Sequence, residues 1–252
     1  MLKLDKPNPI FMTARISEII IPTCDMCYSR LSSLFSDWED KPVEAVVFER
    51  GCRCNRLPKG SAIFQEGTAA LGMYYLNRGK VKIYKLGEGG KKQIVRLANK
   101  GDLIGYKALI SGEVYSATAE VIDDTCLCFI PKNTFFEIIT STPEVCIKLM
   151  QRLAQDLNFI ERMLIDVAQK PVRERVALAI LTLKQTYGLE ADEATIEVEL
   201  SREDIGSIVG TATESIIRLL SEFKKDHIID VQGRKIKILD HDRLLRAAYI
   251  FD

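Results

Sequence analysis

The sequence predicts an α+β protein built, in chain order, from an antiparallel β-roll, a long helix and a C-terminal winged helix-turn-helix. Three observations support this prediction. Short strand-like runs separated by glycine turns occupy residues 46–139. A continuous helical periodicity follows Pro143, and two short helices joined by a tight turn are expected within residues 200–225. The 252 residues are enough for two domains with separate hydrophobic cores.

The composition excludes several classes of protein. The formal net charge is zero, so any surface that binds nucleic acid must be a local feature. Hydrophobic residues make up 47% of the chain, but no apolar run approaches the length of a membrane span, and the N-terminal residues lack the pattern of a signal peptide. We therefore expect a cytoplasmic protein whose seven cysteines are thiols or metal ligands rather than disulfides.

Glycine-punctuated runs predict the roll, which we place at residues 41–142, after a cysteine-containing segment at residues 1–40. The turn signals include Lys59-Gly60, Arg78-Gly79 and Lys100-Gly101-Asp102. The expected strands are Ala62–Phe64, Met73–Leu76, Val81–Lys85, Gln93–Leu97, Ala117–Val121 and Thr125–Ile130. Regularly spaced short strands of this kind are typical of antiparallel rolls and barrels.

The long helix is predicted at residues 143–169, between Pro143 and a break at Pro171. Its apolar residues alternate in steps of four and three, which is the spacing of a coiled-coil seam. The seam residues are Cys146, Met150, Leu153, Leu157, Ile160, Leu164 and Val167. We predict that this helix forms a parallel dimer. The alternative is an ordinary core helix that packs back on the roll.

The segment that follows residue 200 carries the signals of two consecutive helices. Ser201 with Asp204 three residues later is a capping-box pattern for the first helix, and Thr211 with Glu214 repeats that spacing for the second. Gly210 provides the backbone freedom that a sharp turn between the two helices requires.

The second of these helices has two different faces. One face carries the apolar residues Ile216, Leu219, Leu220 and Phe223 at helical spacing. The opposite, N-terminal face carries Thr213, Glu214, Ile217 and Arg218. A helix-turn-helix inserts such positions into the major groove of DNA. We therefore predict DNA contacts for Ser201, Thr211, Thr213, Glu214, Ser215, Ile217, Arg218 and Lys235. The alternative is a helical hairpin inside a core, in which Glu214 is only a cap.

A basic hairpin follows the two helices. Ile228–Leu239 contains two short apolar runs joined at Gln232-Gly233, and it carries Arg234, Lys235 and Lys237. Between residues 218 and 237, six basic residues stand against three acidic ones. Since phosphate contacts supply much of the affinity for DNA, we expect this hairpin to be a wing that touches phosphates. Residues 170–252 are accordingly predicted to form a DNA-binding domain.

A roll, a long helix and a winged helix-turn-helix in this order resemble the Crp–Fnr superfamily of bacterial transcription regulators. The resemblance covers about residues 45–240, and its most specific parts are LPKGSAIFQEG, the GDLIG turn and LSREDIGSIVGTATESIIRLL. It implies a cyclic-nucleotide-binding-like roll, a homodimer, an inverted-repeat site in double-stranded DNA, and RNA polymerase as a partner. It also implies a half-site similar to TTGAT or TGTGA. Thr213 stands where the cyclic-AMP type has an Arg, which favours the TTGAT-like form.

Family members that bind cyclic AMP carry a Glu for the ribose and an Arg for the phosphate after the Gly-Asp-x-Ile-Gly turn. In this chain Tyr106 stands at the Glu position and Tyr115 at the Arg position. A phosphate buried in a roll needs a fixed cation, and Arg is the residue best suited to it. Lys107 is one position off and is expected to point elsewhere. A cyclic-nucleotide effector is therefore disfavoured.

The cysteines indicate a different effector. Oxygen-sensing family members hold a [4Fe–4S] cluster with three cysteines in the N-terminal segment and one in the roll. By this resemblance Cys24 and Cys27 lie in the right segment, and Cys128 is the counterpart of the roll cysteine. The enteric pattern would place the third N-terminal ligand at Ser33, where this chain departs from the family.

Cys52 or Cys54 offers a replacement for the third ligand, as in relatives of the Bacteroidetes type. The candidate ligands of a [4Fe–4S] cluster or zinc are therefore Cys24, Cys27, Cys52 and Cys128. The alternative is a set of unliganded thiols, with Cys126, Cys128 and Cys146 as small residues of the core.

Three functions are compatible with the sequence. The first is a homodimeric, sequence-specific DNA-binding transcription regulator of the Fnr-like branch that is independent of cyclic AMP. The second is an iron–sulfur or metal-responsive regulator whose cysteines switch DNA binding. The third is a ligand-binding roll with a vestigial helix-turn-helix, against which the presence of both Glu214 and Arg218 argues. No enzyme is predicted, because the sequence has no nucleophile elbow and no phosphate-cradling glycine loop.

Overall fold

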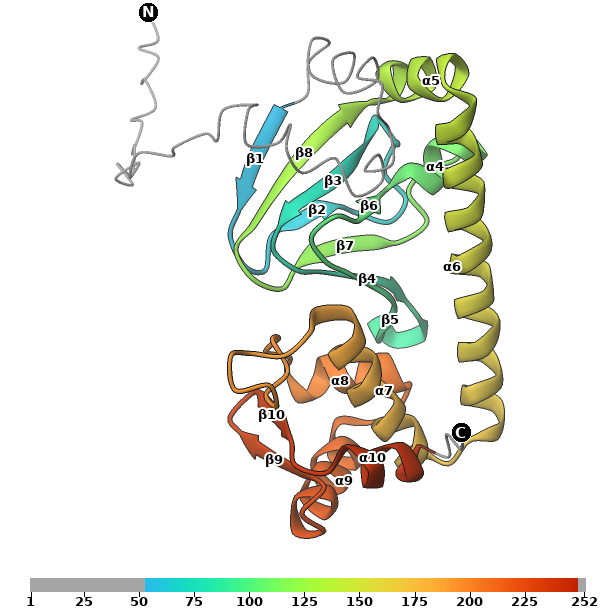
Figure 1. Ribbon diagram of the computed structural model, residues 1–252. Helices are drawn as coiled ribbons and strands as arrows, with labels where there is room; N and C mark the ends of the chain where they lie inside the picture. The colour runs from blue at the N-terminus through green and yellow to red at the C-terminus, as the bar shows by residue number, and fades with distance from the viewer. Residues whose placement is uncertain (1–52, 249–252) are drawn as a thin grey trace, which may run out of the picture.

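The computed structural model describes residues 53–248, and it confirms the α+β class with the predicted order of elements. In Figure 1 the roll lies at the top, one long helix runs down the side of the molecule, and a smaller, mainly helical domain lies below the roll. The chain therefore passes from the roll to the lower domain along the long helix.

The roll consists of two antiparallel four-stranded sheets. The first has the order β1-β8-β3-β6, with β1 Arg53–Leu57, β8 Thr125–Pro131, β3 Gly72–Arg78 and β6 Leu103–Ile104. The second has the order β2-β7-β4-β5, with β2 Ala62–Phe64, β7 Thr118–Val121, β4 Val81–Leu86 and β5 Lys92–Ala98. A short 3-10 turn, Glu88–Gly90, joins β4 to β5. Six of these strands match the runs expected from the sequence, whereas β1 and β6 were not expected.

The turn between β3 and β4 shows why glycine punctuates the roll. Gly79 has a φ of 104°, a left-handed conformation that is strained for any residue with a Cβ. A Cβ at this position would also collide with Thr125 at the start of β8. The glycine thus lets β3 reverse into β4 while β8 passes close by.

Two short helices that the sequence did not predict complete the roll. These are α4 (Tyr106–Ser111) and α5 (Lys132–Ser141), both drawn beside the upper part of the long helix in Figure 1. Large side chains from the helices and strands fill the interior, and the following are almost completely buried: Tyr75, Leu76, Ile104, Tyr106, Leu109, Leu127 and Phe135.

The long helix, α6, spans Pro143–Gln169. Proline is tolerated at its start because the first turn of a helix has no intrahelical partner for that N–H. At 1.5 Å per residue the helix is roughly 40 Å long. Val145 and Leu149 are buried against the core of the roll, and Leu153 packs half-buried against the same cluster. Only this first part of α6 behaves as an ordinary core helix.

The remaining residues of the predicted seam form an exposed apolar stripe in the single chain. Met150, Leu157, Ile160, Leu164 and Val167 are between 40% and 69% exposed. A contiguous apolar surface of this kind on a helix marks an interaction site. The stripe is therefore available for a second copy of α6.

The lower domain has one hydrophobic core. Its elements are α7 (Val172–Tyr187), α8 (Arg202–Val209), α9 (Thr213–Lys225), β9 (Ile229–Gln232), β10 (Lys235–Ile238) and α10 (His241–Ala247). The core includes Ile180 of α7, Ile205 of α8 and Phe223 of α9, and it also takes in Ile122 from the roll. Among the described helices, none has both the length and the apolar character that crossing a membrane requires.

Candidate nucleic-acid interface

The first helix of the pair is fixed at its start by the predicted capping box. The Ser201 hydroxyl accepts a hydrogen bond from the Asp204 N–H at 3.0 Å and donates to the Asp204 carboxylate at 2.7 Å, while the Ser201 N–H also donates to that carboxylate. The box satisfies backbone donors at the N-terminus of α8. At the other end Gly210 adopts the left-handed conformation (φ 71°), as the turn requires.

The predicted start of the second helix is wrong by one residue. The N-cap of α9 is Ala212, whose side chain makes no capping hydrogen bond, and Thr211 lies before it. The reason is the geometry of the turn, because the backbone N–H groups of Gly210 and Thr211 both donate to the carbonyl of Gly206. The backbone of Thr211 thus takes part in closing α8, and the hydrogen bonds of α9 begin at the carbonyl of Ala212.

The two faces of α9 are those expected from the spacing of its residues. Ile216, Leu219, Leu220 and Phe223 are buried in the core of the domain. On the opposite face Glu214 is exposed, Ile217 is 51% exposed and the Arg218 side chain is 65% exposed. Thr213 is half-buried at the first position of the helix. The helix thus presents a polar and partly apolar surface outward from its N-terminal half.

A chain of charged groups holds Arg218 in place. Its guanidinium donates to Glu222 one turn later at 2.6 Å, and Glu222 also pairs with Arg173 of α7 at 3.2 Å. Arg173 reaches Asp226 at 3.1 Å and lies over the ring of Phe223. Exposed ion pairs contribute roughly 0–1 kcal/mol, so little free energy is lost when Arg218 leaves Glu222 for another acceptor. Sequence reasoning missed Glu222, although its spacing of four residues from Arg218 is a signal for such a pair.

The other predicted contacts lie around this helix. Ser215 and Thr211 are half-buried near the N-terminus of α9, and the Ser201 hydroxyl is used in the capping box of α8. DNA contacts by these three residues stay predictions.

The hairpin β9–β10 forms the predicted wing, with Gln232 opposite Lys235 and a turn at Gly233. Arg202 at the start of α8 donates to the Gly233 carbonyl at 2.7 Å and so ties the wing to the helix pair. This link had no signal in the sequence.

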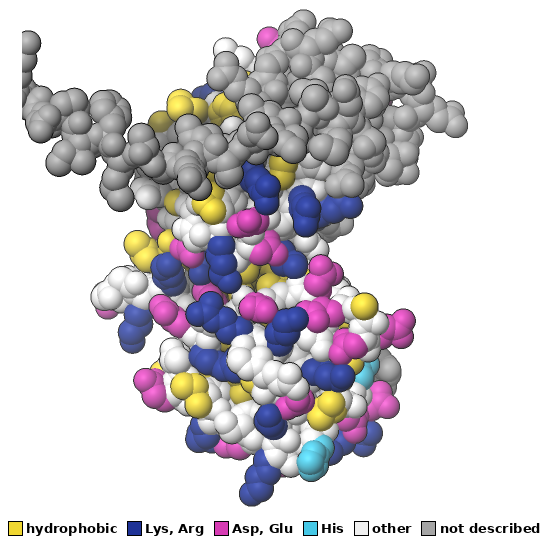
Figure 2. Space-filling view, turned by 90° about the vertical axis from the view of Figure 1, so that its left-hand side faces the viewer, with side chains coloured by type: hydrophobic (Ala, Val, Ile, Leu, Met, Phe, Trp, Pro, Cys, Tyr) yellow, Lys and Arg dark blue, Asp and Glu magenta, His cyan; other side chains and the backbone are white. Residues whose placement is uncertain are grey.

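Most of the basic residues in this region are paired with carboxylates, so they are less available to phosphates than the sequence suggested. Lys235 bonds to Glu190 at 2.7 Å, Lys237 to Asp192 at 3.1 Å, and Lys224 to Asp230 at 2.7 Å. The hydrogen bond that Lys235 donates to the Glu190 carboxylate raises the pKa of Lys235. Figure 2 shows Lys and Arg side chains interspersed with Asp and Glu over this domain. The acidic partners Glu190 and Asp192 come from the loop after α7, far from the wing in sequence.

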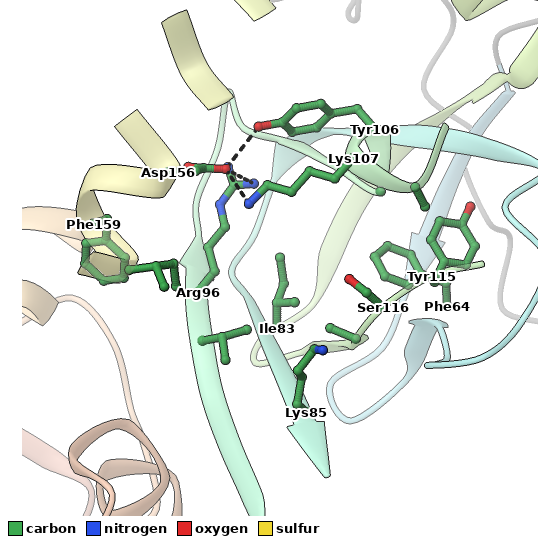
Figure 3. Close-up of a pocket in the computed structure, with 15 residues that line it drawn as sticks. Phe64, Ile83, Lys85, Arg96, Tyr106, Lys107, Tyr115, Ser116, Asp156 and Phe159 are labelled. Carbon is green, nitrogen blue, oxygen red and sulfur yellow. Dashed lines mark hydrogen bonds and ion pairs between the residues drawn. The ribbon is translucent and has the colours of Figure 1, made fainter. Parts of the chain in front are cut away.

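A hollow with a volume of about 310 Å³ lies between the roll and α6. It contains the two tyrosines that replace the cyclic-AMP anchors (Figure 3). The Tyr115 hydroxyl donates to the Gly72 carbonyl at 2.7 Å, and its ring stacks on Phe64. The Tyr106 hydroxyl donates to Asp156 of α6 at 3.0 Å. Burial raises the pKa of both tyrosines to about 12, so both are neutral hydroxyls and neither can replace a phosphate-binding cation.

The expectation that Lys107 points away from this hollow is wrong. Lys107 lines it, and its ammonium group bonds to the Asp156 carboxylate at 2.8 Å. The carboxylate of α6 attracts the lysine across the hollow, and a pattern of single residues does not reveal such a partner.

Of the four candidate cysteine ligands, the structure describes only Cys128. Cys24, Cys27 and Cys52 lie outside the described residues. Cys128 is completely buried in the apolar core of the roll, beside residues such as Met73 and Tyr75. In the sheet, the backbone of Cys128 is in register with that of Cys54. Within residues 53–248 no group of three or more His, Cys, Asp or Glu side chains is placed to hold a metal ion.

Comparison with known families decides the identity of the chain. Residues 54–142 match the cyclic nucleotide-binding domain, and residues 174–247 match the Crp-like helix-turn-helix domain. The chain belongs to the Crp/Fnr family. Both matches fall on the elements described above, with the first on the roll and the second on the lower domain.

Other members resemble this Crp/Fnr protein over most of its length. It is 27% identical to the fumarate and nitrate reduction regulatory protein of Vibrio cholerae over 76% of this chain and 77% of that one. It is 29% identical to electron transport regulator A of Shewanella oneidensis, covering 75% of each chain. The structure of FixK2 from Bradyrhizobium japonicum superposes with a TM-score of 0.71 at 27% identity, over 78% of this chain and 97% of that one. The Vibrio cholerae and Shewanella oneidensis relatives are named as regulators. This Crp/Fnr protein is likewise a DNA-binding transcription regulator and not an enzyme.

Cyclic AMP should not bind to this Crp/Fnr protein with useful affinity, because Tyr106 and Tyr115 offer no cation for its phosphate and Lys107 in the same hollow is already paired with Asp156. Titration calorimetry of the purified protein with cyclic AMP should give no saturable heat. A dissociation constant in the micromolar range or tighter would contradict this prediction.

Proposed function

We propose that the protein binds an inverted-repeat DNA site as a homodimer and regulates transcription from it. The observation that carries the proposal is the division of α9 into a face buried in the domain core and an exposed face with Glu214, Ile217 and Arg218. A helix with one face fixed in a core and the other open is what major-groove reading requires. RNA polymerase is the partner that such a regulator would recruit or exclude.

The exposed face suggests how bases are read. Arg218 is suited to bind guanine through O6 and N7, and Glu214, one turn earlier, can accept a hydrogen bond from the amino group of cytosine. Ile217 offers apolar surface to a thymine methyl group. Together they suit a half-site with a G·C pair, and the family resemblance favours a TTGAT-like sequence.

The second copy is expected to pair through α6. Its exposed stripe runs over five of the seven predicted seam positions, and no charged residue occurs among the seven. Burying apolar surface is favourable by about 25 cal/mol per Å², so two stripes of this kind should associate in parallel. The pairing would set two α9 helices at a fixed separation for two half-sites.

Arg218→Ala should weaken binding to the preferred site by about 1–3 kcal/mol and relax discrimination at one base pair. Fluorescence anisotropy with the preferred site and with single-base variants measures both effects. Lys235→Ala is the matched control. Because Lys235 would contact a phosphate, its loss should weaken binding to all sequences about equally and reduce the salt dependence. An Arg218→Ala protein that keeps its full sequence preference would contradict the assignment of α9.

Leu157→Glu should convert the dimer into a monomer, because a buried and unpaired charge costs several kcal/mol. Light scattering should report the mass of one chain, and DNA affinity should be largely lost. Asn158→Glu adds the same charge to α6 beside the seam and should leave the dimer intact. A dimeric Leu157→Glu protein would show that the seam lies elsewhere.

A second candidate function is a regulator that responds to iron–sulfur chemistry or zinc through its cysteines. The observation that favours it is the register of β1 with β8, which places the backbone of Cys54 opposite that of Cys128. Against it stands the burial of Cys128 among apolar side chains, which hold it as a core residue. The thiolates would serve as the ligands of the metal or cluster.

Anaerobic purification followed by iron and zinc analysis and a visible spectrum tests this second function. If a cluster is present, a broad absorption that air bleaches should appear, and Ser substitution at Cys24, Cys27, Cys52 or Cys128 should abolish it. Cys146→Ser is the control and should leave the absorption unchanged. Colourless protein without iron or zinc would rule the function out.

A further inference from the structure

The carboxylate of Asp156 reaches from α6 into the hollow of the roll, and its side chain is only 13% exposed (Figure 3). One oxygen accepts from the Tyr106 hydroxyl at 3.0 Å and from Lys107 at 2.8 Å, and it lies 3.7 Å from Arg96. The other oxygen lies 3.5 Å from Arg152. A single acidic group on the helix is thus surrounded by three cations and a hydroxyl.

This contact is isolated on the helix. Among residues 154–162 of α6, every side chain other than Asp156 is exposed. In the middle of α6, Asp156 is therefore the only one of these side chains that is buried to this extent against the roll of its own chain. The hollow beside the carboxylate is not filled by side chains, since about 310 Å³ stays open and is lined largely by apolar residues such as Phe64, Ile83 and Phe159.

Charge explains why the carboxylate stays in this place. Burial alone would raise the pKa of Asp156, but the charge of Arg96 and the hydrogen bonds from Lys107 and Tyr106 outweigh it and lower that pKa. Asp156 is therefore ionised at neutral pH. Removing it would leave Lys107 without its anion and Arg96 with Asp102 as its remaining carboxylate partner, which is unfavourable in a partly dry site.

Two of these cations, Arg96 and Arg152, are also connected through polar contacts to the DNA-binding domain. Arg96 and Arg152 both bond to Asp102, at 3.4 Å and 2.8 Å. Asp102 accepts from the N–H of Asn99 at 2.9 Å, and the Asn99 side chain donates to the carbonyl of Thr186 in α7 at 2.8 Å. A continuous set of polar contacts thus joins the middle of α6, the roll and the first helix of the lower domain.

We propose that Asp156 is a built-in anionic ligand of the roll, a positioning residue that latches α6 and, through Asp102 and Asn99, sets the orientation of α7 for DNA binding. In this state no small anion is needed to complete the hollow. The link to DNA affinity rests on the proposed function, whereas the latch itself does not.

Asp156→Ala tests the latch in the full-length dimer. The variant should stay dimeric by light scattering and lose about tenfold in DNA affinity, the scale of a typical coupling between sites. Acetate or formate at millimolar concentration should restore part of that affinity, because either anion can take the place of the missing carboxylate, while chloride at equal ionic strength should not. Asp166→Ala is the matched control, since in the described structure Asp166 pairs only with Lys170 at the C-cap of α6.

Hydrogen exchange separates the latch from the proposed function. In Asp156→Ala, the amides of α4 and of residues 154–162 should exchange faster, and acetate should slow their exchange again. Both effects should appear in the absence of DNA. If the unaltered protein binds no inverted repeat, the proposed function is wrong. The exchange rates still test the contact between Asp156 and the roll, because they do not depend on DNA. Should Asp156→Ala not fold, Lys107→Gln, which changes a half-exposed partner, should show a smaller loss of the same kind. Wild-type affinity and exchange in the folded variant, or a loss that acetate leaves unchanged, would overturn the proposal.

Discussion

The arrangement of the two domains depends on one buried ion pair. Lys82 of β4 bonds to Asp204 of α8 at 2.6 Å and to Glu120 of β7 at 2.9 Å, with side chains 10%, 19% and 18% exposed. Asp204 is also the acidic partner in the capping box of α8, so the same carboxylate fixes the start of the helix and its position under the roll. A lysine taken out of water needs such partners, because a buried charge is costly without them. The turn after α8 and the reading face of α9 are positioned from this point.

Several polar connections link the roll to the rest of the chain, among them Lys82 to α8, Asn99 to α7, and Asp156 of α6 to the hollow. They differ in burial and in whether a small molecule could reach them. The lysine pair is enclosed by protein, whereas the Asp156 site borders an open hollow. In the proposed latch a change at the hollow would act on α6 and α7, whereas α8 is attached to the roll separately through Lys82. This is the kind of two-point attachment through which a roll can bias the orientation of a DNA-binding domain.

The sequence predicted what depends on local pattern. Alternation and glycine turns located six strands, a spacing of four and three located α6, and helical spacing separated the two faces of α9. It could not predict partners that are far apart in the chain, such as Lys107 with Asp156, Lys82 with Asp204, or the carboxylates beside the wing lysines. Periodicity shows on which face of an element a side chain lies, but not which residue lies next to it. The misplaced cap at Thr211 has a similar cause, since the closing of α8 uses that residue first.

Selection of bound sequences from a random DNA library with the full-length protein tests the central claim most directly. The account predicts enrichment of an inverted repeat whose half-sites lie about one helical turn apart, centre to centre, each with a G·C pair within reach of Glu214 and Arg218. Enrichment of a site without two-fold symmetry, or no enrichment at all, would contradict the account.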